Sequence, residues 1–244
     1  MPLLEWGSLS RKAINAHLAR GSVVALPIGS LEQHGDHLPT HTDAYLAEAV
    51  VREAAARARS QVVVLPCFSF GISSYHARFG GTVWLSASTF LAVMHDLCAS
   101  VRSAGARTFM PINGHGGNAG ALELVSLESS DHEFSVIPIS YWELVPEAAA
   151  NVFAADKGAI GHAGQAETSL MLALQSECVG EIAQSHESVD VELARDRANV
   201  DGLGRSGVVG DPTLARAELG TTFFDAVCNE LAAVLDAVSA HAAR

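Results

Sequence analysis

Two segments of the chain gather side chains of the types that bind metal ions. Glu32 and His34 are two residues apart, and an extended backbone would point both side chains to the same side. Asp43 follows directly before an expected helix, and His115 stands between glycines. Imidazole and carboxylate ligands without thiolates favour Zn²⁺, Mn²⁺ or Fe²⁺ over a structural zinc site built from cysteines.

A third segment adds a histidine and a carboxylate. His162 lies in a Gly-His-Ala-Gly stretch five residues before Glu167, which stands at an expected helix start. Three carboxylates and two imidazoles exceed what one four-coordinate ion uses, so the hypothesis is two ions bridged by a shared carboxylate. Such a pair generates a hydroxide nucleophile and polarises a carbonyl group. Two alternatives stay open: Asp43 as a helix N-cap, and Glu167 as a first-turn acid that complements the helix dipole.

Apolar, β-branched runs alternate along the chain with segments of helical periodicity. This order predicts an α/β fold with a mainly parallel sheet that helices cover on both faces. Ligands of such sheets bind at the carboxyl ends of the strands, so the loops above should meet there. No repeat or linker divides the chain, which predicts a single domain over residues 1–244. The expected strands are 22–28, 61–65, 107–112 and 133–139, and the expected helices are 44–57, 89–103, 119–127, 168–174 and 219–239. The irregular stretch 185–211 is interpreted as a surface loop, with a flap over the site or a subunit contact as alternatives.

The charge balance excludes several classes of partner. A net charge of -12, from 27 acidic and 15 basic residues, argues against binding of nucleic acid or of an anionic membrane. No apolar run is long enough to span a bilayer, and the first residues do not resemble a signal peptide, so the expected location is cytoplasmic. The four cysteines form no CxxC pair and are expected to be unpaired. The motifs GxSxG, the Walker lysine motif and GxGxxG after a strand are missing from the sequence.

Several motifs in register resemble the creatininase (creatinine amidohydrolase) family. The resemblance implies a three-layer α/β/α sandwich, a binuclear zinc or manganese centre and hydrolysis of a C–N bond. It also implies a homo-oligomer, often a hexamer built as a trimer of dimers. Glu32 and His34 would bind different metals, Asp43 would bridge them, His115 would be a further ligand, and His162 would protonate the leaving nitrogen. The motifs are Gly29–Gly35, Thr42-Asp43, Gly71–Thr82, Asn113–Asn118 and His162-Ala163-Gly164 leading to Glu167-Thr168-Ser169.

Departures from that pattern bear on the substrate. Creatinine-cleaving members carry a glutamate where this chain has Gly117, and Glu167 is expected to supply the missing carboxylate. They also carry a tryptophan at the position of Gly158 and an acid at that of Gly161, so this site should be roomier. Trp142 matches an aromatic pocket residue of the family, or packs in the core at a strand end. The expected substrate contacts are Ser73, His76, Gly116, Gly117 and Trp142.

The resulting hypothesis is a metal-dependent hydrolase of a small cyclic or linear amide. Two alternatives lie within the same family: a formamide deformylase, and a peptidase of the mycofactocin precursor peptide, which the segment Gly207–Pro212 resembles. A third alternative, from another class, is a metal-binding scaffold without turnover.

Overall fold

The computed structural model describes residues 3–153, 160–182 and 206–242. Its centre is one sheet in the strand order β1-β3-β2-β4-β5, in which β6 also pairs with β4 and every pairing is parallel. The strands are β1 (Leu4–Glu5), β2 (Val23–Ile28), β3 (Val62–Val64), β4 (Thr108–Asn113), β5 (Ser135–Val136) and β6 (Ile139–Ser140).

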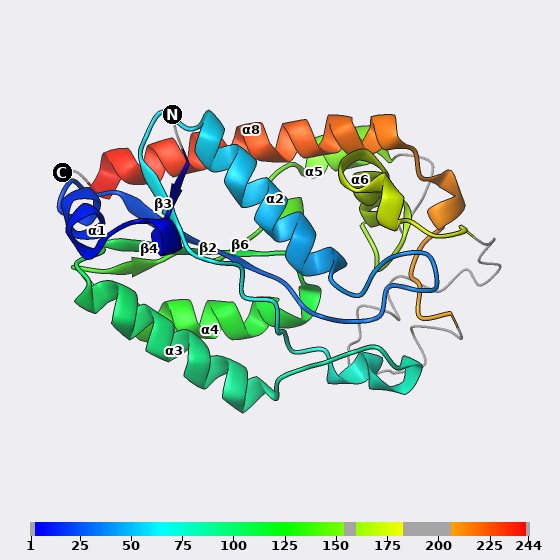
Figure 1. The fold of residues 1–244 in the computed structure, drawn as a ribbon, viewed down its shortest axis with the longest axis horizontal. Helices are drawn as coiled ribbons and strands as arrows, with labels where there is room; N and C mark the ends of the chain where they lie inside the picture. The colour runs from blue at the N-terminus through cyan, green and yellow to red at the C-terminus, as the bar shows by residue number, and fades with distance from the viewer. Residues whose placement is uncertain (1–2, 154–159, 183–205, 243–244) are drawn as a thin grey trace.

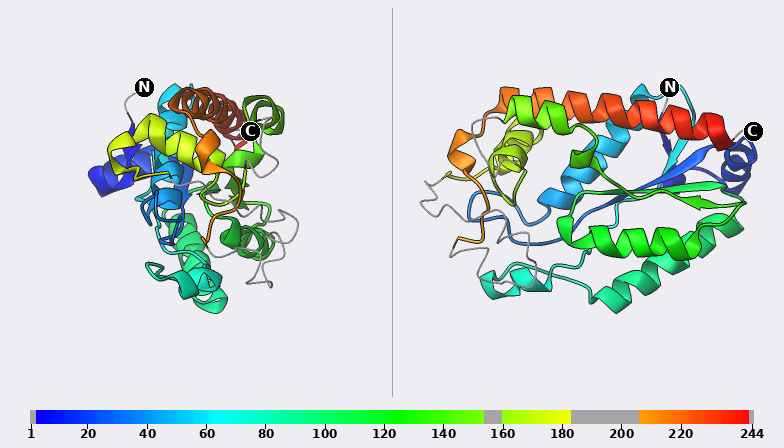
Figure 2. Two further views of the ribbon diagram at one scale, coloured as in Figure 1. Left: turned by 90° about the vertical axis from the view of Figure 1, so that its right-hand side faces the viewer. Right: turned by 180° about the vertical axis from the view of Figure 1, so that it is seen from behind.

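Helices cover both faces of this sheet, as Figures 1 and 2 show. On one face pack α2 (Thr42–Arg57), α5 (Pro146–Val152), α6 (Gln165–Leu174) and α8 (Ala217–Ala242). On the other face pack α1 (Arg11–Leu18), α3 (Ala87–Ser103) and α4 (Ala119–Ser129). The predicted three-layer α/β/α sandwich is therefore confirmed.

The continuous apolar strands follow from this double cover. Val23 and Ala25 of β2 pack toward α2 and α8, whereas Val24 and Leu26 pack toward α1 and α3. Alternate side chains of a strand point to opposite faces, so a strand covered on both sides must be apolar at every position. All six residues of β2 are buried accordingly.

Some expected elements differ in detail. The strand expected over 133–139 is two short strands, β5 and β6, on either side of Ile137 and Pro138. Proline has no N–H to donate to a sheet, which explains the interruption. Helix α2 begins at Thr42 and α6 at Gln165, each earlier than expected. The short elements β1, α1 and α5 were not predicted. Of the irregular stretch 185–211, residues 185–205 lie outside the described residues.

All four cysteines are free thiols, as expected. No helix in the described part of the chain is both long and apolar enough to cross a membrane.

Candidate metal centre

The loops that follow β2 and β4 start side by side. The two strands are neighbours, with Ile28 opposite Asn113, and the Gly114 N–H donates to the Ile28 carbonyl at 2.7 Å. Parallel strands end at the same edge of a sheet, so Glu32 and His34 after β2 meet His115 after β4.

Two asparagines hold these loops together with the loop after β3. The side chain of Asn113 accepts a hydrogen bond from the His115 N–H at 3.0 Å. The Asn118 amide donates to the Gly29 carbonyl at 3.1 Å and accepts from the Ile72 N–H at 3.0 Å. Buried amides with both groups satisfied fix loop geometry, so the ends of three strands form one rigid unit.

Asp43 enters this unit from helix α2, because glycines let the helix approach. A Cβ at Gly29 would lie 2.3 Å from the Ala44 nitrogen, and one at Gly114 would lie 2.5 Å from the Asp43 carbonyl oxygen. The N-cap of α2 is His41, with no side-chain capping bond, and Asp43 lies in the first turn. The capping alternative for Asp43 is therefore wrong.

Each oxygen of the Asp43 carboxylate faces a different histidine. Oδ1 lies 2.9 Å from His34 Nε2, and Oδ2 lies 3.0 Å from His115 Nδ1. A second carboxylate stands beside each ring: Glu32 Oε2 is 3.2 Å from His115 Nδ1, and Glu167 Oε2 is 3.7 Å from His34 Nε2. Asp43 thus lies between two groups of ligand atoms, one on each side.

The polar groups at this centre fit divalent cations. Both oxygens of Glu32 and Oδ2 of Asp43 are buried without a hydrogen-bond partner, which is costly unless a cation neutralises them. His34 directs Nδ1 to the Glu32 carbonyl at 3.0 Å, and His115 directs Nε2 to the Ile72 carbonyl at 3.1 Å. A ring N–H that donates outward leaves the inner nitrogen with its lone pair, the usual arrangement of metal-binding histidines.

Candidate ligand atoms gather in three groups, each within 4.8 Å: Glu32, Asp43 and His115; His34, His162 and Glu167; and Glu32, His76 and His162.

Burial and the neighbouring charges shift the pKa values of this cluster. Burial raises the pKa of Glu32. Burial alone would lower the pKa of His34, but Asp43 and Glu167 outweigh it, and the pKa lies well above its usual value. The pKa of His115 is raised in the same way, against burial, chiefly by Glu32. A proton and a cation compete for one lone pair, so cation binding here releases protons.

His162 is held in a strained loop at the edge of the cluster. Ala163, which follows it, has φ 53°, and its N–H donates to Glu167 Oε2. His162 pairs through its backbone with Val209, with N···O distances of 3.1 and 2.7 Å. Burial and then the nearby His34 and His76 lower the pKa of His162 well below its usual value. The ring is therefore neutral at pH 7.

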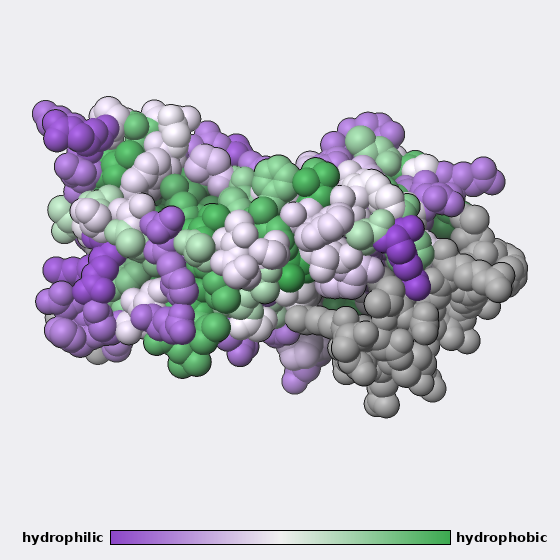
Figure 3. Space-filling model, turned by 90° about the horizontal axis from the view of Figure 1, so that it is seen from below, coloured by the Kyte–Doolittle hydropathy of each residue, from purple (hydrophilic) through white to green (hydrophobic). Residues whose placement is uncertain are grey.

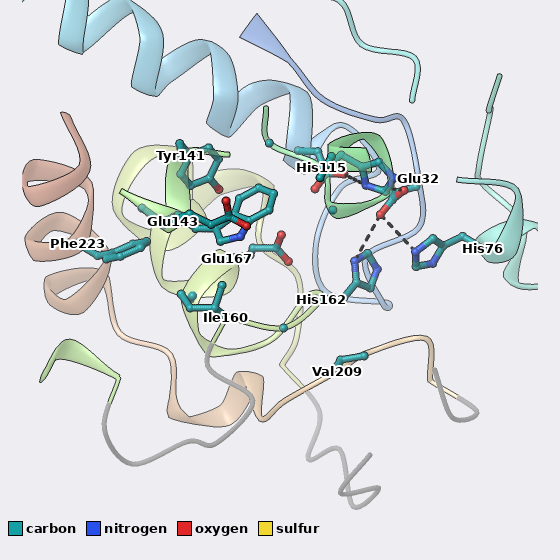
Figure 4. A pocket seen from close by; sticks show the side chains of 18 of the residues that line it. Glu32, His76, His115, Tyr141, Glu143, Ile160, His162, Glu167, Val209 and Phe223 are labelled. Atoms are coloured by element: carbon teal, nitrogen blue, oxygen red, sulfur yellow. Dashed lines mark ion pairs between the residues drawn. The ribbon is translucent and has the colours of Figure 1, made fainter. Parts of the chain in front are cut away.

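A cavity of about 560 Å³ opens onto the cluster. Figure 4 shows Glu32, His76, His115 and His162 at one end and Tyr141, Glu143 and Phe223 at the other, with Glu167 between them. Trp142 lines this cavity and also packs against the buried core that includes residues of α8.

The expected substrate contacts separate into two sets. His76, Gly116 and Trp142 line the cavity, whereas Ser73 and Gly117 are not among the described lining residues. Ser73 is fully buried and accepts a hydrogen bond from the Ser30 hydroxyl at 2.8 Å. A Cβ at Gly117 would lie 2.2 Å from the Ile72 carbonyl oxygen and 2.3 Å from His115 Nε2. A glutamate cannot occupy that position in this backbone, and Glu167 Oε2 stands beside His34 instead.

Sequence reasoning gave no role to several residues of the site. Gln33 lies inside the Glu-Gln-His motif, and its amide contacts His76 and His162. His37 contacts the Ala163 carbonyl at 3.1 Å and so supports the strained loop. The sequence signal for Gln33 was its place between two candidate ligands, whereas Phe223 of α8 carried none.

The parallel α/β/α sandwich gathers buried carboxylates and imidazoles at the carboxyl ends of its strands, an arrangement that suits a metal-dependent hydrolase. The family model described as creatinine amidohydrolase matches residues 7–235. The chain belongs to this creatininase family of amidohydrolases, as its motifs had indicated.

Relatives of known activity span most of the chain. The mycofactocin precursor peptide peptidase of Mycobacterium tuberculosis (strain ATCC 25618 / H37Rv) is 32% identical over 223 residues, which cover 85% of this chain and 82% of that protein. The creatinine amidohydrolase of Pseudomonas putida is 32% identical over 190 residues, covering 71% and 72%. A crystal structure of creatinine amidohydrolase superposes with a TM-score of 0.77 at 28% identity, covering 99% and 98%.

Proposed function

We propose that this chain hydrolyses a C–N bond of a small cyclic or linear amide, using two divalent cations. Glu32, Asp43 and His115 would hold one cation, and His34, Asp43 and Glu167 the other. The observation that carries this proposal is the Asp43 carboxylate, whose two oxygens face His34 and His115 at 2.9 and 3.0 Å. A buried carboxylate in that position suits a bridge between two cations.

Zinc or manganese is the cation that we propose, with Fe²⁺ also compatible with the donors. Oxygen and imidazole nitrogen ligands without thiolates suit these ions. Similar solved structures include a creatininase mutant described as Zn-Zn type and a structure described as creatininase Mn, at 25% and 27% identity.

The residues of the chain would divide the chemistry as follows. When bound, two divalent cations polarise the amide carbonyl and activate a water molecule. His162 directs Nε2 to the Gln33 carbonyl at 2.8 Å, which leaves a lone pair on Nδ1. Nδ1 would take up the proton of the attacking water and deliver it to the leaving nitrogen as the C–N bond breaks. The strained Ala163 backbone and its bond to Glu167 keep this ring beside the cluster.

The cavity supports a neutral or cationic substrate. Among the described residues that line it, none is a lysine or an arginine, and Glu143 is an acidic residue that is not a proposed cation ligand. Trp142 and Phe223 offer apolar surface at the far end. A volume of about 560 Å³ lies within the usual range for small-molecule sites.

The second candidate is the alternative within the family, a peptidase of a short precursor peptide. One observation favours it: the 32% identity to the mycofactocin precursor peptide peptidase extends over 85% of this chain and 82% of that protein, against 71% and 72% for the creatinine amidohydrolase. The cavity of about 560 Å³ would admit the end of a short peptide. Nothing in the geometry favours a formamide deformylase in the same way.

A screen of the metal-loaded protein tests these candidates. Purified protein with Zn²⁺ or Mn²⁺ would be offered creatinine, cyclic ureas and imides, formamides and short peptides, with release of ammonia or amine as the readout. We expect turnover of one class, abolished in Asp43→Ala. Two tightly held cations without turnover of any amide, in the wild type and in His162→Ala alike, would favour the metal-binding scaffold.

We also propose that the protein is a cytoplasmic homo-oligomer, with a hexamer as the family precedent. Figure 3 views the side of α3 and α4, where hydrophobic and hydrophilic surface lie side by side. Leu127 of α4 is 81% exposed and Leu124 of the same helix is 40% exposed. Two exposed leucines three residues apart on one helix form apolar surface that a subunit contact would bury. Light scattering of wild type and Leu127→Glu tests this, and a monomeric wild type would contradict it.

A further inference from the structure

Four histidines direct a ring nitrogen at the buried carboxylates: His34, His76, His115 and His162. Each ring also has an outer nitrogen, the one that points away from the carboxylates. In three of the four histidines this outer nitrogen lies within hydrogen-bond distance of a backbone carbonyl. His34 faces the Glu32 carbonyl at 3.0 Å, His115 the Ile72 carbonyl at 3.1 Å and His162 the Gln33 carbonyl at 2.8 Å. A carbonyl can only accept, so each outer nitrogen carries a hydrogen, and in the neutral ring the inner nitrogen holds the lone pair.

His76 differs because its outer nitrogen meets a side-chain amide. His76 Nδ1 lies 2.8 Å from Gln33 Nε2, and its inner nitrogen, Nε2, lies 3.4 Å from Glu32 Oε1. Which way the Gln33 amide points therefore decides where His76 carries its proton.

Backbone groups fix the orientation of the Gln33 amide. Its Oε1 accepts a hydrogen bond from the Gly35 N–H at 2.9 Å, and its Nε2 donates to the Gly207 carbonyl at 2.9 Å. A flipped amide would set its NH₂ against the Gly35 N–H and its oxygen against the Gly207 carbonyl. Two buried backbone groups would then face groups of their own kind, which folded proteins avoid.

The second amide hydrogen of Gln33 must go to His76. The other nitrogen in reach is His162 Nε2, at 3.1 Å, but it already carries a hydrogen that it donates to the Gln33 carbonyl. An N–H cannot accept a hydrogen bond, so His76 Nδ1 accepts. A neutral His76 then carries its hydrogen on Nε2, which faces the Glu32 carboxylate.

We propose that His76 is a hydrogen-bond donor of the active site and not a metal ligand, and that Gln33 is the positioning residue that holds it in this tautomer. Its N–H is directed at Glu32 Oε1 and stands on the cavity wall. At 3.4 Å this contact is longer than an ordinary hydrogen bond, and the oxygen has no other hydrogen-bond partner, so the N–H would orient the Glu32 carboxylate as hydrogen bonds to ligating carboxylates do in other metal sites. The group Glu32, His76 and His162 then holds no cation, which leaves the two cations proposed above, on which this inference rests.

The tautomer itself can be measured. Two-bond ¹H–¹⁵N correlation spectra of the Zn²⁺-loaded protein distinguish protonated from unprotonated ring nitrogens, and His76→Gln identifies the His76 signals. We expect His76 with an unprotonated Nδ1 and a protonated Nε2. In Gln33→Glu the carboxylate has no hydrogen to donate, so the proton should move to Nδ1. A proton on Nδ1 in the wild type, or an unchanged tautomer in Gln33→Glu, overturns the proposal.

A matched control is another glutamine beside a histidine. Gln61 Oε1 lies 3.0 Å from His17 Nδ1, outside the site. Gln61→Glu makes the same chemical change and should leave the His76 signals where they are in the wild type. Movement of the His76 signals in this variant would mean that added charge, and not the contact with Gln33, sets the tautomer.

Metal counting gives a second measurement that requires no substrate and does not depend on how Gln33→Glu folds. We expect His76→Ala to bind as many cations per chain as the wild type, and loss of one cation would make His76 a ligand. With a substrate in hand, His76→Ala should lose roughly 10- to 100-fold in kcat, the effect of one hydrogen bond to a charged group. His76→Gln, whose amide nitrogen can replace Nε2, should recover part of this loss. A wild type that binds two cations but turns over no amide would refute the proposed function, while the tautomer and the cation count would still test His76.

Discussion

Replacing Gly117 with alanine should damage both the stability of the protein and one of its cation sites. The added Cβ would lie 2.2 Å from the Ile72 carbonyl oxygen and 2.3 Å from His115 Nε2. Neither neighbour is the free end of a flexible side chain: Ile72 is held by Asn118, and His115 by Asn113. The backbone must therefore move, and the His115 ring moves with it.

The size of the effect follows from the cost of overpacking a tight site. Inserting one methyl group there costs about 1–3 kcal/mol, which for a chain of this size lowers Tm by about 2–12 °C. Differential scanning calorimetry measures the shift, and elemental analysis measures the cation content. We expect Gly117→Ala to hold less than the wild-type amount of the cation next to His115.

Gly120, three residues after Gly117, supplies the matched control. It lies in α4 and is exposed, and a Cβ there would meet nothing within 4 Å. Replacing a helical glycine with alanine stabilises by about 0.5–1 kcal/mol, so Gly120→Ala should raise Tm by about 1–4 °C with full cation content. If Gly117→Ala matched Gly120→Ala in both measurements, the close packing inferred at Gly117 would be refuted.

Further predictions concern the proposed ligands and the proton carrier. Asp43→Ala should lose both cations or most of one, because its carboxylate faces both histidines; elemental analysis with two full sites would disprove the bridge. Glu167→Gln should lower the occupancy of one cation more than the other, and an unchanged stoichiometry would return Glu167 to a helix-dipole role. His162→Ala should keep both cations while kcat falls by roughly 100- to 10,000-fold, and departure of a cation would make His162 a ligand. Removal of tightly bound cations with a chelator should lower Tm, since a ligand at 100 times its Kd stabilises by about 2.7 kcal/mol; an unchanged Tm would contradict a buried cation site.

The sequence was informative where one local rule sufficed. Glu32, His34 and His115 follow buried parallel strands, and the ends of such strands meet, so their proximity was predictable. Asp43 was placed just before its helix instead of in its first turn, because the start of a helix depends on tertiary contacts at Gly29 and Gly114. The strand over 133–139 was expected to be continuous, although Pro138 marked the break that separates β5 from β6.

What could not be predicted depends on contacts between distant parts of the chain. Gln33 is fixed by the carbonyl of Gly207, 174 residues later, and no local pattern connects them. An amide between two candidate ligands looks like a spacer until both backbone partners are known. The same holds for the rings of His76 and His162, whose tautomers follow from the Gln33 side chain and backbone.

Gly29 and Gly114 have a consequence for which ion the protein selects. A side chain at either position would push α2 away from the end of the sheet. The spacing of the Asp43 carboxylate from His34 and His115 therefore depends on both residues being glycine. Ions of different radius require different spacing of the same ligands. Preference for one ion over another can thus be altered at two positions that never touch it, without changing a single coordinating group.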